Sequence, residues 1–263
     1  MNGQNIEVIV KTDKGTIKEI NQDNFLIKVG RIDRGDIGLF VICDGLGGLS
    51  KGEIASKFMV TALQRWWNTR LNQILTSFIR DEDILRELNK ALLEGNSQII
   101  NFGRENDIKL GTTCSMILIL KEKFYICHIG DSRIYSIDNT INQLTKDHTY
   151  YNKLIEEGEI EKSKTVNKSI LTQCIGVKEA IKPVYLVGKL KKEAFFLLCS
   201  DGFYRNMSEG DFYRMKYEIE ETSDYGYMGE ICSKYVDFVK QKGEKDNISV
   251  ILVKYKMGGN DRV

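Results

Sequence analysis

The sequence is poor in the residues that several common kinds of site require. Its 263 residues include two histidines, His128 and His148, and a single proline, Pro183. Zinc sites of hydrolases often take several imidazole ligands, and this chain can hardly supply them. No proline-rich linker, low-complexity tract or internal repeat divides the chain, so we expect one domain over residues 1–263.

Net charge and long apolar runs are also lacking. Lysine and arginine number 38 against 37 aspartates and glutamates, a formal net charge of +1, so no overall field draws the chain toward nucleic acid or anionic lipid. The longest apolar runs, such as residues 114–120 and 194–199, are far too short to span a bilayer. The N-terminus lacks the basic-then-apolar order of a secretion signal. We therefore expect a cytoplasmic monomer with no nucleic-acid and no membrane partner.

The six cysteines include no CxxC pair, and most lie inside apolar, strand-like segments. In such segments a thiol packs as a small core side chain. A disulfide framework is the alternative, but free thiols in a reducing cytosol fit this placement better.

Hydrophobic periodicity predicts strand pairs separated by helices. Strand-like patterns cover residues 6–10, 25–29, 37–43, 114–120, 124–129, 134–137, 142–144, 184–187, 195–199 and 248–254. Helical patterns cover residues 52–66, 81–99, 208–215 and 227–240, and a short helix that starts within residues 145–149 ends near residue 158. A polar flap is expected near residues 148–170. The order favours an α+β fold of antiparallel sheets covered by helices.

The most informative stretch is VICDGLGG, which places Asp44 at the tip of a buried strand, followed by glycines at positions 45, 47 and 48. A carboxylate beside bare backbone can hold a hard metal ion, with the Gly45 carbonyl as a second oxygen ligand. Taken alone, the stretch fits an ordinary strand-turn-helix corner better, with the aspartate capping the turn.

Four other aspartates share this setting at the end or the start of a strand, which makes the set Asp23, Asp44, Asp131, Asp201 and Asp246. Strand ends can meet at one rim of a sheet, and carboxylates that meet there repel one another unless cations neutralise them. Oxygen-only ligation favours Mg²⁺ or Mn²⁺ over zinc or copper. Two such ions are suited to phosphoryl transfer, because they lower the pKa of a bridging water and offset charge on phosphoryl oxygens.

Seven motifs now carry a family resemblance: in chain order NQDN, VICDGLGG-x-x-x-GE, LGTT, HIGDSRIY, LTKDH, LLCSDG and DNISV. Each alone is weak, but together, in this order and spacing, they resemble the metal-dependent protein phosphatases (type 2C serine/threonine phosphatases), especially bacterial single-domain members. The likeness runs from about residue 8 to residue 255. It implies a central sandwich of two antiparallel sheets flanked by helices on both sides, with the site at one end.

The resemblance also implies roles for the aspartates. Asp44 would bridge two metal ions, Mn²⁺ or Mg²⁺, and the Gly45 carbonyl would bind one of them. Asp201 and Asp246 would ligate the first ion, and Asp23 would hold metal-bound waters.

A third, weaker ion would be held by Asp131 together with Asp201. The substrates would be phosphoserine and phosphothreonine proteins, the products of a serine/threonine kinase, hydrolysed by direct attack of the metal-bridging water.

The chain departs from the family pattern at several positions. Gln22 stands where a glutamate is usual, and the phosphate-binding arginine falls on Lys18, which can neutralise phosphate but cannot grip it bidentately. Leu46 stands where relatives carry histidine or methionine, so the general acid is unassigned. The flap over residues 159–169 lacks the usual His-Pro-x-Arg run. These departures leave an alternative open, a phosphatase-like regulatory or binding module with weak or no turnover.

Other phosphatase classes fit less well. Metallophosphoesterases need clustered histidines, and a haloacid-dehalogenase-type enzyme needs an Asp-x-Asp after an apolar strand, which this chain lacks. We expect His128 to be a packed core histidine and Asp147 to cap the helix beside His148. Arg133 is expected to form a structural ion pair with Asp131.

Overall fold

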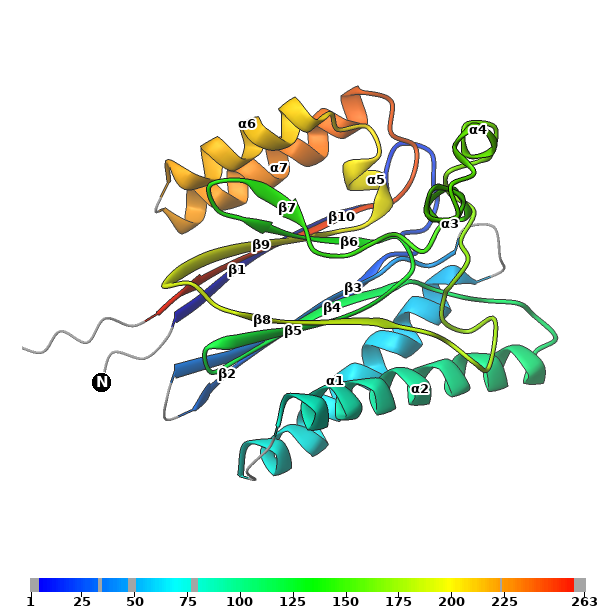
Figure 1. The fold of residues 1–263 in the computed structure, drawn as a ribbon, viewed down its shortest axis with the longest axis horizontal. Helices are drawn as coiled ribbons and strands as arrows, with labels where there is room; N and C mark the ends of the chain where they lie inside the picture. The colour runs from blue at the N-terminus through cyan, green and yellow to red at the C-terminus, as the bar shows by residue number, and fades with distance from the viewer. Residues whose placement is uncertain (1–4, 33–34, 47–50, 77–79, 223, 258–263) are drawn as a thin grey trace, which may run out of the picture.

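The computed structural model describes residues 5–32, 35–46, 51–76, 80–222 and 224–257. Within these residues the strands form two five-stranded antiparallel sheets, stacked as a sandwich with helices on both outer faces (Figure 1). The α+β sandwich expected from the sequence is therefore confirmed.

The two sheets have the orders β2-β3-β4-β5-β8 and β1-β10-β9-β6-β7. The first contains β2 (Asn24–Ile32), β3 (Gly35–Cys43), β4 (Cys114–Leu120), β5 (Lys123–Ile129) and β8 (Val184–Lys189). The second contains β1 (Asn5–Asp13), β10 (Ile248–Lys256), β9 (Glu193–Cys199), β6 (Arg133–Ile137) and β7 (Ile141–Gln143).

Long helices cover each sheet, as their apolar stripes predict. The pair α1 (Gly52–Thr76) and α2 (Asp81–Glu105) covers the first sheet, and the pair α6 (Glu209–Glu220) and α7 (Tyr225–Gln241) covers the second (Figure 1).

Strand β3 shows how the layers are joined. All nine of its residues are buried, and successive side chains point to opposite faces of a strand. Leu39 and Val41 pack in the cluster under α1 and α2. Phe40 and Ile42 pack against the second sheet, in a cluster that includes Phe196. Burial on both faces explains why the strand is a continuous apolar run rather than an alternating one.

The thiols are placed as the sequence predicts, mostly inside the core. All six cysteines are free, and five of them are buried, while Cys174 is partly exposed. No helix in the described part of the chain has the length and apolarity that a membrane crossing requires.

The structure also differs from the sequence expectations in local detail. Strand β2 runs to Ile32 and β3 begins at Gly35, so both are longer than the strands expected over residues 25–29 and 37–43. The flap contains α3 (Tyr150–Glu156) and a short helix, α4 (Ile160–Ser163). The latter was missed because four residues carry too little periodicity to detect.

The start of α3 corrects another expectation. Its N-cap is Thr149, whose hydroxyl accepts a hydrogen bond from the Asn152 N–H at 3.2 Å. Asp147 was expected to cap this helix, but its carboxylate is engaged by Arg133 at 2.7 Å. A threonine is a good cap in its own right, and the buried ion pair is a long-range contact that the local sequence does not reveal.

Candidate metal centre

The five aspartates lie on segments at one end of the sandwich, the end where α3 and α5 (Asp201–Tyr204) are drawn (Figure 1). Strand register explains this. Asn24 pairs with Cys43 across β2 and β3, which makes Asp23 and Asp44 neighbours. Cys199 pairs with Val250 across β9 and β10, which brings the segments that carry Asp201 and Asp246 together.

Asp23 is buried, and only one of its two carboxylate oxygens is hydrogen-bonded. Its Oδ2 accepts hydrogen bonds from the hydroxyls of Ser200 at 2.9 Å and Ser249 at 2.7 Å, whereas its buried Oδ1 has no hydrogen-bond partner. Burial raises the pKa of Asp23 to about 6, and the charge of Asp246 adds to the shift. A buried carboxylate oxygen without a partner is what a bound cation would satisfy.

Asp44 is held in place through its backbone. Its N–H donates to the Thr113 hydroxyl at 2.9 Å, and its carbonyl accepts from the Thr113 N–H and the Thr112 hydroxyl, both at 2.8 Å. Burial raises the pKa of the Asp44 carboxyl well above its usual range, and the charges of Asp23, Asp131 and Asp246 raise it further. The carboxyl group thus lies within electrostatic reach of three other acids.

Gly45 lies where no side chain fits. A Cβ there would come within 2.4 Å of the Gly52 carbonyl oxygen and 2.7 Å of the Gln22 carbonyl oxygen. The Gly45 N–H donates to that Gln22 oxygen at 3.2 Å. Bare backbone at this corner agrees with the sequence interpretation of Gly45; the glycines at 47 and 48 lie outside the described residues.

Asp131 is buried in the turn between β5 and β6, where burial raises its pKa to about 6 and Asp147 adds to the shift. The expected ion pair between Arg133 and Asp131 is wrong. The Arg133 guanidinium instead donates to both oxygens of Asp147, at 2.7 to 3.1 Å. Side chains two residues apart on a strand leave from the same face, but Asp131 precedes the strand, so that rule does not apply to the pair.

The remaining two aspartates, Asp246 and Asp201, form ion pairs with basic side chains. The Lys18 ammonium is 2.9 Å from the Asp246 carboxylate, so this predicted phosphate-binding residue reaches the acid cluster. The Arg205 guanidinium forms an ion pair with Asp201 and lies 3.8 Å from both Asp246 and Glu244. Sequence reasoning missed Arg205, although its position four residues after Asp201 is the signal for a pair across one helical turn.

The five aspartates lie near one another, but their carboxylates do not converge on one position where an ion could bind. Within the described ranges, no three aspartate, glutamate, histidine or cysteine side chains form a ready-made ion-binding group. Two effects explain why the carboxylates stay apart: they repel one another, and some of them pair with Lys18 and Arg205 instead. The orphaned Asp23 oxygen and the raised pKa values nevertheless fit oxygen ligands for a hard divalent cation.

The two histidines lie beside this end and stack on each other with ring centroids 5.0 Å apart. His128 is buried between the Ser115 hydroxyl at 2.8 Å and the Lys146 carbonyl at 3.0 Å, which confirms its structural role. His148 accepts from the Gly130 N–H at 3.1 Å through Nδ1. It therefore contacts the residue that precedes Asp131.

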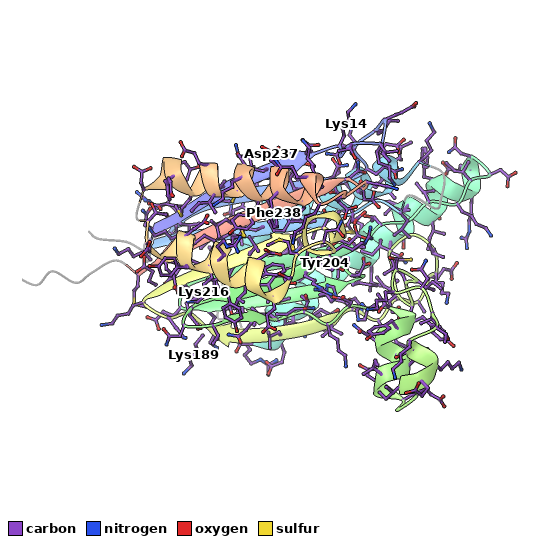
Figure 2. All side chains as sticks on the ribbon, turned by 90° about the horizontal axis from the view of Figure 1, so that it is seen from above. Lys14, Lys189, Tyr204, Lys216, Asp237 and Phe238 are labelled. Atoms are coloured by element: carbon purple, nitrogen blue, oxygen red, sulfur yellow. The ribbon has the colours of Figure 1, made fainter. Side chains whose placement is uncertain are left out.

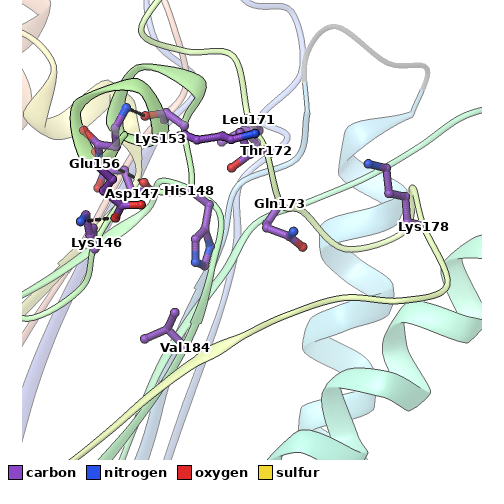
Figure 3. Close-up of a pocket in the computed structure, with 12 residues that line it drawn as sticks. Lys146, Asp147, His148, Lys153, Glu156, Leu171, Thr172, Gln173, Lys178 and Val184 are labelled. Carbon is purple, nitrogen blue, oxygen red and sulfur yellow. Dashed lines mark hydrogen bonds and ion pairs between the residues drawn. The ribbon is translucent and has the colours of Figure 1, made fainter. Parts of the chain in front are cut away.

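A cavity of about 650 Å³ opens next to His148. Figure 3 shows His148 and Gln173 at this cavity, with Lys178 reaching toward them from the other side. No carboxylate within the described residues pairs with the Lys178 ammonium. His148 lines the cavity and accepts from the N–H of Gly130, the residue before Asp131, so the cavity adjoins the acid cluster.

Comparison with known proteins gives consistent results. The family model described as Protein phosphatase 2C matches residues 16–226. Protein phosphatase PhpP of Streptococcus pneumoniae is 32% identical over 257 residues, which cover 94% of this chain and 97% of that protein.

Solved structures of similar fold agree. Serine/threonine phosphatase Stp1 from Staphylococcus aureus superposes with a TM-score of 0.80 at 26% identity, over 98% of this chain and 97% of that one. The catalytic domain of the serine threonine protein phosphatase PstP, in complex with 2 manganese ions, has a TM-score of 0.76 over 96% of this chain and 99% of its own. At 24% identity this last likeness shows the fold alone.

Proposed function

Because the chain belongs to the protein phosphatase 2C family and is a protein serine/threonine phosphatase, we propose that its five-aspartate end is a metal-dependent catalytic centre. The observation that carries the proposal is the unpartnered, buried Oδ1 of Asp23 beside an Asp44 carboxyl whose pKa is raised by three neighbouring acids. Such crowding is tolerable when divalent cations neutralise it. The manganese ions of the PstP domain are a precedent in the same fold.

The residues that would hold Mn²⁺ or Mg²⁺ are Asp44, with the Gly45 carbonyl, and the pair Asp201 and Asp246. Ions held there would lower the pKa of the attacking water and offset charge on the phosphoryl oxygens. The two serine hydroxyls on Asp23 fix the orientation of its carboxylate, and its second oxygen would be free to accept from metal-bound water.

The chain's own residues supply positioning and charge. Thr112 and Thr113 fix the backbone of Asp44. Lys18, which lies on Asp246, can move its ammonium to a phosphate oxygen of the substrate, though as a point charge rather than a bidentate fork. We assign Asp44, Asp23 and Lys18 as the catalytic residues.

The finer features of the biology are also proposals. Residues 1–263 would act as one catalytic domain, in keeping with a family match over residues 16–226. The substrates would be phosphoproteins made by a serine/threonine kinase, because a phosphatase needs a reaction that supplies its phosphomonoester. We propose a monomer in the cytoplasm, where six free thiols are stable.

Phosphate release from a phosphoserine peptide tests the function. We expect turnover with Mn²⁺ or Mg²⁺ and none after chelation, with a phosphotyrosine peptide as the comparison for specificity. No release at millimolar Mn²⁺ would favour the phosphatase-like binding module instead.

We propose that the polypeptide part of the substrate lies over the cavity beside His148. Lys178→Glu should raise KM for an acidic phosphopeptide by about 5-fold, the size expected for an exposed charge contact. Hydrolysis of p-nitrophenyl phosphate should not change, since that substrate has no polypeptide part to contact Lys178. The control is Lys189→Glu, at the far end of β8 from α3 (Figure 2). Equal effects of Lys178→Glu on both substrates would refute this placement.

A further inference from the structure

Arg205 occupies an unusual position among the acids. It follows α5, and its N–H donates to the Asp201 carbonyl at 2.9 Å, so the two residues are one helical turn apart and their side chains are neighbours. The guanidinium forms an ion pair with that carboxylate and lies 3.8 Å from Asp246 and from Glu244. One permanent positive charge thus meets three carboxylates.

Glu244 holds the Arg205 guanidinium in place, and Glu244 is not one of the expected metal ligands. Its carboxylate is buried and already fixed, accepting from the backbone N–H groups of Lys245 at 2.8 Å and Asp246 at 2.9 Å and from the Asn206 amide at 2.8 Å. Because these hydrogen bonds hold the Glu244 carboxylate in place, we expect the Arg205 guanidinium to stay beside it when metal ions bind.

The charge of Arg205 also reaches the acids on the other side of the cluster. Burial raises the pKa of Asp131, and Arg205 opposes that shift. Burial and neighbouring acids raise the pKa of Asp44, and Arg205 again opposes them. Asp201, one of the pair expected to hold a third ion, is therefore already paired with a guanidinium whose charge also acts on the other member, Asp131.

We propose that the Arg205 guanidinium takes the place of the third divalent ion, so that this chain binds two ions rather than three. The inference rests on the proposed metal centre. Asp201 has two carboxylate oxygens. With the first ion on one of them, a third ion at Asp131 and Asp201 would need Oδ2, to which the Arg205 guanidinium already donates, and like charges that share one ligand atom repel each other. Arginine suits the role because it stays charged at any accessible pH and binds a carboxylate through a rigid fork.

Counting bound ions tests the proposal directly. The electron paramagnetic resonance signal of free Mn²⁺, measured at millimolar Mn²⁺, gives the number of ions bound per chain without any turnover. We expect two for the natural protein and three for Arg205→Gln. Arg205→Lys, which keeps the charge, should bind two, as should Arg65→Gln, which breaks only the exposed pair with Glu94 on the long helices.

Three ions in the natural protein, two in Arg205→Gln, or three in Arg205→Lys would each overturn the proposal. Zero ions in every variant would refute the metal centre itself, and the inference with it. Melting curves in chelator show whether each variant is folded. Arg205→Gln should melt below the natural protein there and should regain the difference in millimolar Mn²⁺, because the ions replace the lost counter-charge.

Discussion

Asp44→Asn is expected to lower phosphatase turnover by about 100-fold or more, since even groups that only orient metal ligands are worth about 10- to 100-fold. The amide keeps the shape of the side chain, and the backbone bonds of Asp44 to Thr112 and Thr113 do not involve the carboxylate. Steady-state kinetics with a phosphopeptide at saturating Mn²⁺ measure the effect. Asp201→Asn should behave in the same way.

The loss should be specific to the site rather than to folding. In the absence of metal, Asp44→Asn should melt no lower than the natural protein, because the substitution removes a charge that burial and three other acids oppose. Asp237→Asn, an exposed carboxylate on α7 (Figure 2), is the matched control and should keep full activity. Full activity of Asp44→Asn would contradict the role assigned to this residue.

Stabilisation by Mn²⁺ is expected to weaken as the pH falls through about 6. The pKa values of Asp23 and Asp131 are raised to about 6 in the folded chain, against an ordinary value of 3.8. Protonation of these two groups therefore stabilises the metal-free fold, and this contribution is complete below pH 3.8 and lost as the pH rises through about 6. Ions bind the deprotonated carboxylates, so below about pH 6 each displaced proton costs about tenfold in affinity per pH unit.

The difference in melting temperature between Mn²⁺ and chelator, measured at each pH, isolates this effect. Burial lowers the pKa values of His128 and His148, which destabilises the fold at low pH with or without ions, so the histidines cancel in the difference. We expect a large rise in melting temperature at about pH 8 and a much smaller one at about pH 5. A rise that does not depend on pH would show that the ions do not compete with protons for Asp23 and Asp131.

The fold was largely predictable because its signals are local. The long helices carry clear apolar stripes, and a strand such as β3 is a continuous apolar run. Short elements were not predictable: α4 and α5 have four residues each, less than the repeat needed to recognise a helix. Strand order and register depend on contacts far apart in the sequence and were not predicted; the family resemblance supplied only the sandwich of two antiparallel sheets.

The site was predictable as a set of acids but not as a network of charges. Strand-end position identified the five aspartates. The partners of these acids depend on tertiary structure: Arg133 binds Asp147 rather than Asp131, and Arg205 lies on Asp201. Side chains as long as arginine can choose among several carboxylates, so neighbours in sequence do not determine which ion pair forms.

Anomalous diffraction from crystals soaked in Mn²⁺ tests the metal centre most directly. We expect two manganese peaks bridged by Asp44, one of them also bound by Asp201 and Asp246, with the Arg205 guanidinium still beside Glu244. Manganese bound away from Asp44, or none at this end of the sandwich at millimolar Mn²⁺, would contradict the assignment of these aspartates as the catalytic metal ligands.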